Sequence, residues 1–229
     1  NAALTLPLNS ANDLILSYSE GFRAPTFNDL YDPWYGNPDL QAERSKSYEL
    51  QWRSRYSDTG SLQASLYRTE IEDAIVLDEN FIPQNVQTAR INGFEAAVQQ
   101  ELFGWQANLA LALIDPRDRA SGHTLQRRAK RTLSLDVDRR FGDVSLGAGW
   151  RAISGRYDDA ENQRDMSGYG LLSLRAAWQA NEELGLSLKL DNLLDKDYAE
   201  ATYSTPNGRF GYNSAGRTAL FAVTWTPQF

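Results

Sequence analysis

Hydrophobic and polar residues alternate along the C-terminal stretch Ala215–Phe229, AGRTALFAVTWTPQF. Counted with a period of two, one face carries Ala219, Phe221, Val223, Trp225 and Phe229, and the other carries Ala222, Thr224, Thr226 and Gln228. This pattern predicts a strand with an apolar environment on one side and water on the other. Because terminal residues of soluble domains usually fray into water, a strand that ends on an aromatic residue favours a membrane barrel, whose aromatic side chains lie at the lipid–water boundary.

Similar alternating stretches recur along the whole chain, separated by turn-forming residues. They predict eleven strands, each about long enough to cross a bilayer at a tilt. The expected strands are Ala2–Leu8, Asp13–Glu20, Ser45–Tyr56, Ser61–Asp73, Ala89–Glu101, Trp105–Leu113, Arg128–Arg139, Asp143–Ser154, Gly168–Gln179, Leu184–Tyr198 and Gly216–Phe229.

The predicted connections alternate strictly between short and long. The short ones are Asn9–Asn12, Ser57–Gly60, Leu102–Gly104, Arg140–Asp143 and Ala180–Glu183, and the long ones are Gly21–Arg44, Ala74–Thr88, Ile114–Arg127, Gly155–Ser167 and Ala199–Ala215. An up-and-down barrel of the outer-membrane type has this alternation, because its periplasmic turns are short and its outer loops are long.

The two faces of the predicted strands differ in polarity. In one strand Leu184, Leu186, Leu188 and Leu190 lie opposite Gly185, Ser187, Lys189 and Asp191. The reversed register would aim Lys189 at lipid, at a cost of roughly 2–4 kcal/mol near the midplane. We therefore expect the polar face to line a wet interior, whereas a small soluble barrel fills its interior with apolar side chains.

Composition alone resembles that of a soluble protein, with 23% charged residues and a net charge of −7, but membrane barrels share this property because only alternate residues face lipid. No apolar run approaches 18 residues, which excludes a membrane helix. The absence of cysteine and the single histidine exclude disulfides, thiolate chemistry and the usual zinc sites. The acidic balance argues against binding of nucleic acid.

Eleven is an odd number of strands. Single-chain bacterial barrels have even numbers, and an open sheet would leave two unpaired edges in lipid. Either one strand is miscounted or the chain is the C-terminal part of a larger barrel. The chain begins at Asn1 without an initiator methionine or a signal peptide, so we expect a processed protein or an excised piece, which does not fold alone in water.

Gly21–Glu43, GFRAPTFNDLYDPWYGNPDLQAE, resembles a segment of the TonB-dependent outer-membrane receptors, whose barrels carry a similar FRAP segment followed by GNP-x-L-x-x-E. Ile91–Glu95 (INGFE), Asn192–Tyr198 (NLLDKDY) and the terminal Phe229 are similar to further motifs of that family. The resemblance implies an all-β, antiparallel, up-and-down transmembrane β-barrel of about 22 strands in the outer membrane of a Gram-negative bacterium. Residues 1–229 would then form about the last eleven strands.

The resemblance also places several parts of the receptor upstream of this chain. These are the N-terminal plug, the segment that contacts TonB, the first barrel half and its calcium-binding loops. It implies no cofactor within the 229 residues. The expected partners are outer-membrane lipid, a large scarce nutrient and, through the plug, TonB, and receptors of this family can also serve phage or bacteriocins.

Within the family, RRAKR (Arg127–Arg131) and YNSAGR (Tyr212–Arg217) resemble the receptors for cobalamin (vitamin B12). The acidic loop Asp158–Asp165 departs from the aromatic-rich version expected there. The resemblance implies active transport of cobalamin, with no chemistry on the ligand and no catalytic residues. The alternatives are a receptor for a ferric siderophore or haem with the same fold, a passive porin or structural barrel, and an outer-membrane enzyme.

Arg127 and Tyr212 are the main candidates for ligand contacts. Arg127, within the basic run Arg127–Arg131, is either part of a solvated strand end above Asp136 and Asp138 or a hydrogen-bond donor to a ligand amide or phosphate in the upper lumen. Tyr212 is either a boundary aromatic or a flat apolar surface for a large ring ligand. The resemblance to cobalamin receptors implies the ligand role for both.

Other outer-loop residues carry weaker hypotheses. Trp34 and Tyr35 either pack their loop on itself or contact ligand. Asp158, Asp159, Glu161 and Asp165 lack the glycine and the spacing of a dedicated calcium loop, so we expect a solvated loop and no metal site. His123 is the one conventional base for a Ser-His site, and no neighbouring residue type orients it.

Overall fold

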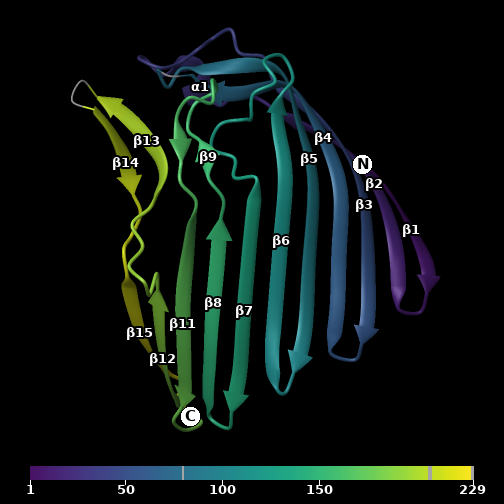
Figure 1. The fold of residues 1–229 in the computed structure, drawn as a ribbon, viewed down its shortest axis with the longest axis vertical. Helices are drawn as coiled ribbons and strands as arrows, with labels where there is room; N and C mark the ends of the chain where they lie inside the picture. The colour runs from purple at the N-terminus through teal and green to yellow at the C-terminus, as the bar shows by residue number, and fades with distance from the viewer. Residues whose placement is uncertain (79, 206–207, 228–229) are drawn as a thin grey trace.

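A computed structural model describes residues 1–78, 80–205 and 208–227 of the chain. Eleven antiparallel strands form one curved sheet in chain order, with its two edges at β1 and β15 (Figure 1). The strands are β1 (Ala2–Asn9), β2 (Asn12–Arg23), β3 (Glu43–Ser57), β4 (Gly60–Leu77), β5 (Pro83–Leu102), β6 (Trp105–Asp118), β7 (Arg131–Phe141), β8 (Val144–Ile153), β11 (Tyr169–Gln179), β12 (Leu184–Asp191) and β15 (Thr218–Trp225). The predicted all-β, antiparallel, up-and-down arrangement is confirmed.

Smaller elements lie beyond one end of the sheet. A short helix, α1 (Phe27–Tyr31), follows β2, and two hairpins are formed by β9 (Arg156–Tyr157) with β10 (Asp165–Met166) and by β13 (Ala199–Thr205) with β14 (Gly208–Asn213). The tight turns gather at the opposite end, as Figure 1 shows. The described part of the chain has no helix that is long and apolar enough to cross a membrane.

The register gives each face of the sheet one character, as the alternation predicts. Leu188 of β12 is paired with Phe221 of β15, and Leu186 with Val223, so large apolar side chains share the outer face. On the inner face, Lys189 forms an ion pair of 2.9 Å with Asp191. The inner face is therefore polar, and burial of an isolated charge in lipid is avoided.

Asp136 and Asp138 of β7 lie on this inner face, where they share one arginine as partner. Arg175 of β11 donates to Asp136 at 2.9 Å and to Asp138 at 2.9 Å. The intervening strand β8 contributes Gly147 and Gly149 at these positions, which leaves room for the long guanidinium to reach across. Arg127 lies four residues before β7 begins at Arg131, so it is not at the strand end itself.

Aromatic side chains mark the two ends of the apolar outer face. Near the tight turns, the rings of Trp105 and Phe141 lie 6.0 Å apart, and Arg139 is placed over both. Toward the loop end, Tyr18 and Tyr48 lie 5.1 Å apart. Two aromatic belts separated by an apolar band are typical of outer-membrane barrels.

Three predicted boundaries are wrong for local reasons. β7 begins at Arg131 instead of Arg128, and β12 ends at Asp191 instead of continuing to Tyr198. Asn192 turns the chain because its φ is +49° and its side-chain amide donates to the carbonyl of Lys196 at 2.9 Å. The last strand ends at Trp225, and the predicted terminal aromatic Phe229 lies outside the described residues.

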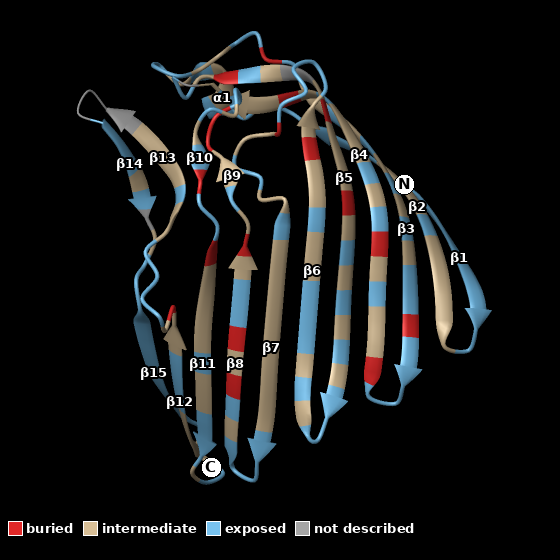
Figure 2. Cartoon of the chain, in the orientation of Figure 1, coloured by how far each residue is buried: buried red, intermediate tan, exposed pale blue. Residues whose placement is uncertain are grey.

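The long connections contain more regular structure than expected. β4 and β5 continue through most of Ala74–Thr88, and the stretch Ala199–Ala215 contains the β13–β14 hairpin. Among the described residues, the buried hydrophobic side chains are Leu40, Ala74, Ala89, Ile153, Met166 and Tyr169. The sheet itself is mostly half-buried or exposed (Figure 2). The apolar surface is thus turned outward to lipid and not inward to a core.

Candidate ligand site in the outer loops

The elements beyond the loop end of the sheet enclose a cavity of about 250 Å³. Its walls come from the β4–β5 hairpin, the segment before β7, the loop between β9 and β10, and β13. The described lining residues are Val76, Leu77, Asp78, Phe81, Gln84, Gln126, Arg127, Asp158, Ala160, Glu161, Arg164, Thr202 and Tyr203. Segments that are up to 127 residues apart in the chain, from 76 to 203, therefore meet at one site.

Asp158 is the residue that joins these segments. Its side chain is only 3% exposed, and its carboxylate accepts a hydrogen bond from Arg127 Nε at 2.8 Å. The same carboxylate accepts from the backbone N–H of Thr202 at 3.1 Å and from the Thr202 hydroxyl. A buried carboxylate is costly unless it is paired and hydrogen-bonded, so these contacts stabilise the arrangement of the three loops.

Arg127 is held by its backbone as well as by its side chain. Its N–H donates to the carbonyl of Tyr157 at 2.6 Å, and its φ of +57° lies in the left-handed region that non-glycine residues rarely occupy. The side chain is 35% exposed, so part of the guanidinium is accessible from the cavity. Arg127 is thus fixed in place while still able to donate further hydrogen bonds.

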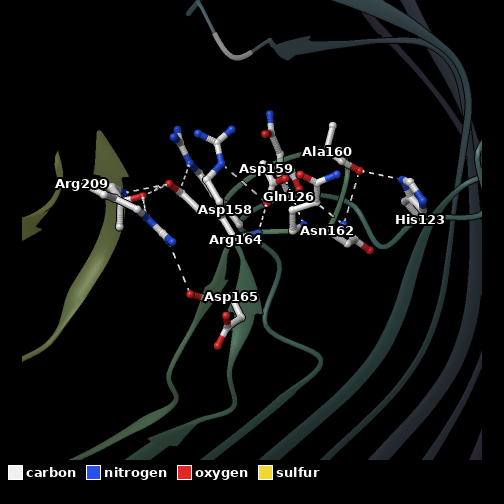
Figure 3. Close-up of polar contacts among 12 residues, drawn as sticks. His123, Gln126, Asp158, Asp159, Ala160, Asn162, Arg164, Asp165 and Arg209 are labelled. Atoms are coloured by element: carbon white, nitrogen blue, oxygen red, sulfur yellow. Dashed lines mark hydrogen bonds and ion pairs between the residues drawn. The ribbon is translucent and has the colours of Figure 1, made fainter. Parts of the chain in front are cut away.

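Asp159, the next residue, forms its hydrogen bonds within its own loop. Its carboxylate accepts from the backbone N–H of Arg164 at 2.7 Å and of Gln163 at 3.1 Å, and the Arg164 side chain lies 3.8 Å away (Figure 3). Asp159 is 3% exposed. These bonds close the loop between β9 and β10 on itself.

A second set of contacts ties that loop to the segment before β7. Asn162 accepts from the N–H of Thr124 at 2.7 Å and donates to its carbonyl at 2.8 Å. The ring of His123 lies 3.1 Å from the carbonyl oxygen of Ala160, as Figure 3 shows. The expectation of a solvated acidic loop is wrong for Asp158 and Asp159, which are buried, because the sequence did not reveal these partners.

The β13–β14 hairpin brings aromatic rings to the site. Tyr203 lines the cavity, and its ring lies 4.9 Å from that of Tyr212 and 5.8 Å from that of Phe210. Tyr212 is 55% exposed and reaches the cavity through Tyr203. Arg209 donates to the Thr202 hydroxyl at 2.9 Å, next to the bond between Thr202 and Asp158. The hairpin therefore offers an accessible apolar surface near Arg127.

Trp34 and Tyr35 lie in a separate loop and do not line this cavity. Asp32 accepts from both of their backbone N–H groups at 2.9 Å, and Trp34 is 80% exposed. The following Asn37 donates to the carbonyl of Pro83 at 2.9 Å, which fixes the GNPDL segment against the start of β5. The ligand role of these two aromatic residues stays a prediction.

Several residues of the cavity were missed by the sequence analysis. Asp158 was included only within an acidic loop, and Tyr203 and Arg164 were not considered. For Tyr203 a signal exists, because Asn207–Gly208 between alternating aromatic residues is a strong hairpin signature. No local pattern pairs Asp158 with Arg127 and Thr202, which are 31 and 44 residues away.

The geometry around His123 does not form a nucleophile and base. The Ser121 hydroxyl donates to Asp118 at 2.6 Å, and the His123 ring faces the Ala160 carbonyl instead of that hydroxyl. Among the described residues, no three acidic or histidine side chains are grouped as ligands of one metal ion. The contacts that the site offers are hydrogen bonds, charge and an aromatic surface.

Comparison with known proteins assigns the class of this chain. Residues 1–193 match the family described as TonB dependent receptor-like, beta-barrel, and the chain belongs to that family. Its members are transporters and receptors, which are not enzymes, and they are proteins of the Gram-negative outer membrane. The resemblance found in the sequence motifs is thereby confirmed, and the chain is an outer-membrane barrel segment.

A curated relative is the vitamin B12 transporter BtuB of Vibrio vulnificus (strain YJ016), which is 32% identical over 98% of this chain. The chain spans 36% of that relative's length. Among solved structures, the ferric yersiniabactin uptake receptor FyuA of Yersinia pestis has a TM-score of 0.84 at 20% identity, covering 97% of this chain and 36% of its own. The copper transporter OprC has a TM-score of 0.83 at 20% identity, covering 97% and 38%. Barrels of one fold thus serve different cargoes.

Proposed function

We propose that these 229 residues are the C-terminal barrel half of a TonB-dependent active transporter for cobalamin. The plug, the first barrel half with its calcium-binding loops and the segment that contacts TonB belong, in this proposal, to the preceding part of the receptor. The observation that supports it is the outer-loop cavity, in which Arg127 and the aromatic hairpin lie together. The 32% identity to a vitamin B12 transporter favours this cargo.

The shape of the site suits the edge of a large ligand. A cavity of about 250 Å³ is below the roughly 300–1,000 Å³ of pockets that enclose drug-sized molecules. A flat ring system can lie against Tyr203 and Tyr212, while Arg127 donates to an amide or phosphate oxygen at its periphery. The remaining contacts come from the rest of the receptor, and no chemistry on the ligand is required.

The test is binding of cyanocobalamin to the purified full-length receptor in detergent with calcium. Arg127→Ala removes one charge-assisted donor, which contributes about 1.5 kcal/mol, and also leaves the buried Asp158 carboxylate without its counterion, so it should weaken binding by at least about tenfold. Tyr203→Ala and Tyr212→Ala should each weaken it similarly. Arg128→Ala is the matched control, because Arg128 belongs to the same basic run but does not line this cavity.

A ferric siderophore is the second candidate cargo, because FyuA has the same fold over 97% of this chain. Competition between cyanocobalamin and a ferric siderophore on the same receptor separates the two proposals. Tight siderophore binding without cobalamin binding would keep the receptor fold and reject the cobalamin assignment. Open conductance without any ligand would instead support a passive porin.

A further inference from the structure

The cavity carries more negative than positive charge. Its described lining residues include three acids (Asp78, Asp158 and Glu161) and two arginines (Arg127 and Arg164), so the lining has a formal net charge of 3 − 2 = 1 negative unit. A negative net charge of the lining is unusual for a site whose most evident polar group is an arginine. A cavity of one charge sign concentrates its field and repels ligands of the same sign.

The guanidinium of Arg127 is not free to bind an anion, because the Asp158 carboxylate lies 2.8 Å from Arg127 Nε and already compensates its charge. An anionic ligand that took the guanidinium for itself would leave the Asp158 carboxylate, 3% exposed, without its counterion. An uncompensated buried charge is strongly unfavourable. A neutral oxygen, in contrast, can accept from the other N–H groups of Arg127 while the ion pair stays intact.

We propose that Asp158 is the specificity-determining residue of this site. It selects neutral ligands rich in carbonyl or amide oxygens, and it rejects polyanions. Asp158 achieves this by keeping Arg127 neutralised and by fixing Thr202, and with it the aromatic hairpin, beside the guanidinium. This inference deepens the proposed function, on which it rests for the location of the ligand.

Asp158→Asn isolates the charge from the geometry. Asparagine fills the same volume and can still accept from Thr202, but it leaves Arg127 uncompensated and brings the net charge of the lining to zero. Asp165→Asn is the charge control: it removes one negative charge from the same β9–β10 hairpin at an exposed residue that does not line the cavity. Thr202→Val removes a contact of the hairpin without changing any charge.

Two probes are titrated calorimetrically into the full-length receptor in detergent: cyanocobalamin, which is neutral overall, and inorganic tripolyphosphate, a small polyanion. In Asp158→Asn, tripolyphosphate should bind at least about tenfold more tightly than in the unchanged receptor. Asp165→Asn and Thr202→Val should leave tripolyphosphate binding unchanged. The backbone amide hydrogens of residues 199–203 and 209–212 should stay protected from exchange in Asp158→Asn, which would show that the β13–β14 hairpin remains in place.

Unchanged tripolyphosphate affinity in Asp158→Asn would overturn the inference, as would an equal gain in Asp165→Asn. These results do not depend on the cargo. A receptor that fails to bind cyanocobalamin, but whose Asp158→Asn variant gains tripolyphosphate binding, rejects the proposed function and keeps the role of Asp158. If the receptor binds cyanocobalamin but Asp158→Asn gains no tripolyphosphate binding, the proposed function is kept and the role of Asp158 is rejected.

Discussion

Buried and half-buried charges at single positions decide much of what this chain does. Arg127, the candidate for a ligand contact, is held by Asp158, and Arg175 is held by Asp136 and Asp138. In both cases the carboxylate partner comes from a segment more than 30 residues away in the sequence. Residue types therefore indicated where charge is concentrated, whereas the pairing depends on how distant strands and loops meet.

Gly149 tests whether the inner-face ion-pair cluster contributes to stability. A Cβ there would lie 2.9 Å from an oxygen of Asp136 and 2.7 Å from the Ser173 hydroxyl. Gly149→Ala should displace these two groups from their contacts and lower the free energy of unfolding by about 1–3 kcal/mol, because the added methyl group takes the space that they occupy. Thermal denaturation of the receptor in detergent, followed by circular dichroism, measures this loss. Gly185→Ala, whose Cβ meets only the end of the flexible Gln179 side chain at 3.2 Å, should cost less, and equal costs would contradict the explanation.

At the scale of elements, the alternation of hydrophobic and polar residues predicted the eleven strands of the sheet. The turn-forming residues predicted the ends of these strands less accurately. The β13–β14 hairpin was expected to be a loop, although Asn207–Gly208 between Tyr203, Phe210 and Tyr212 is a hairpin signal. The NLLDK segment falls within the predicted strand Leu184–Tyr198. Hydrogen bonds from the Asn192 side chain override this prediction.

Asn192 ends β12, and two substitutions separate its conformational role from its hydrogen bonds. The residue has a φ of +49° and is 6% exposed, and its side chain accepts from the Lys196 N–H at 2.8 Å and donates to the Lys196 carbonyl at 2.9 Å. Both variants lose these bonds, at about 1–2 kcal/mol. Asn192→Ala keeps a Cβ in the left-handed region without the local hydrogen bonds that support asparagine there, whereas Asn192→Gly removes the Cβ and should cost about 1 kcal/mol less. Equal unfolding temperatures for the two variants would argue against this separation.

Helix α1 offers a pH-dependent test in the outer loops. Thr26 Oγ1 accepts from the Asp29 N–H at 3.1 Å, and the Thr26 N–H donates to the Asp29 carboxylate at 2.8 Å. The backbone bond from Thr26, and then its hydroxyl, lower the pKa of Asp29. A lowered pKa in the folded state means that this contribution is present above the ordinary carboxyl pKa and is lost as the pH falls through the lowered value.

Asp29→Ala, which removes the carboxylate that accepts from the Thr26 N–H, should therefore destabilise α1 by about 1 kcal/mol at neutral pH. Faster hydrogen exchange of residues 27–31 measures the effect, and the difference from the unchanged receptor should shrink in acid. The exposed Asp39→Asn is a control that leaves the capping residues in place. If the difference in exchange rate grew toward low pH instead, the explanation through the lowered pKa of Asp29 would be contradicted.

For the whole molecule, the open sheet explains why these residues require partners outside themselves. β1 and β15 are its two edges, and each leaves a row of backbone groups without a strand partner in the sheet. Unsatisfied backbone groups in lipid cost several kcal/mol each, and in water the outer leucines would be exposed. We expect residues 1–229 alone in water to show no cooperative unfolding. A sharp transition in circular dichroism without detergent would contradict this expectation.

The orientation of the sheet is tested by two neighbouring positions of β6. Leu111 is paired with Leu133 on the apolar face, and Ala110 is paired with Ser134 on the polar face. Leu111 is six residues beyond the belt residue Trp105, which places it about 14 Å along the membrane normal at a tilt of about 45°, near the middle of an apolar band about 25 Å tall. A charge at that depth on the lipid side has no water or counterion to compensate it.

Leu111→Lys should therefore cost about 2–4 kcal/mol, whereas Ala110→Lys, one residue away on the wet face, should cost little. Equilibrium folding of the two full-length variants into lipid vesicles measures the difference directly. If Ala110→Lys were the more damaging change, the polar face would be the one turned to lipid. The cavity beside Arg127 would then lie outside the barrel, and its assignment as the mouth of a transport route would fail together with the orientation.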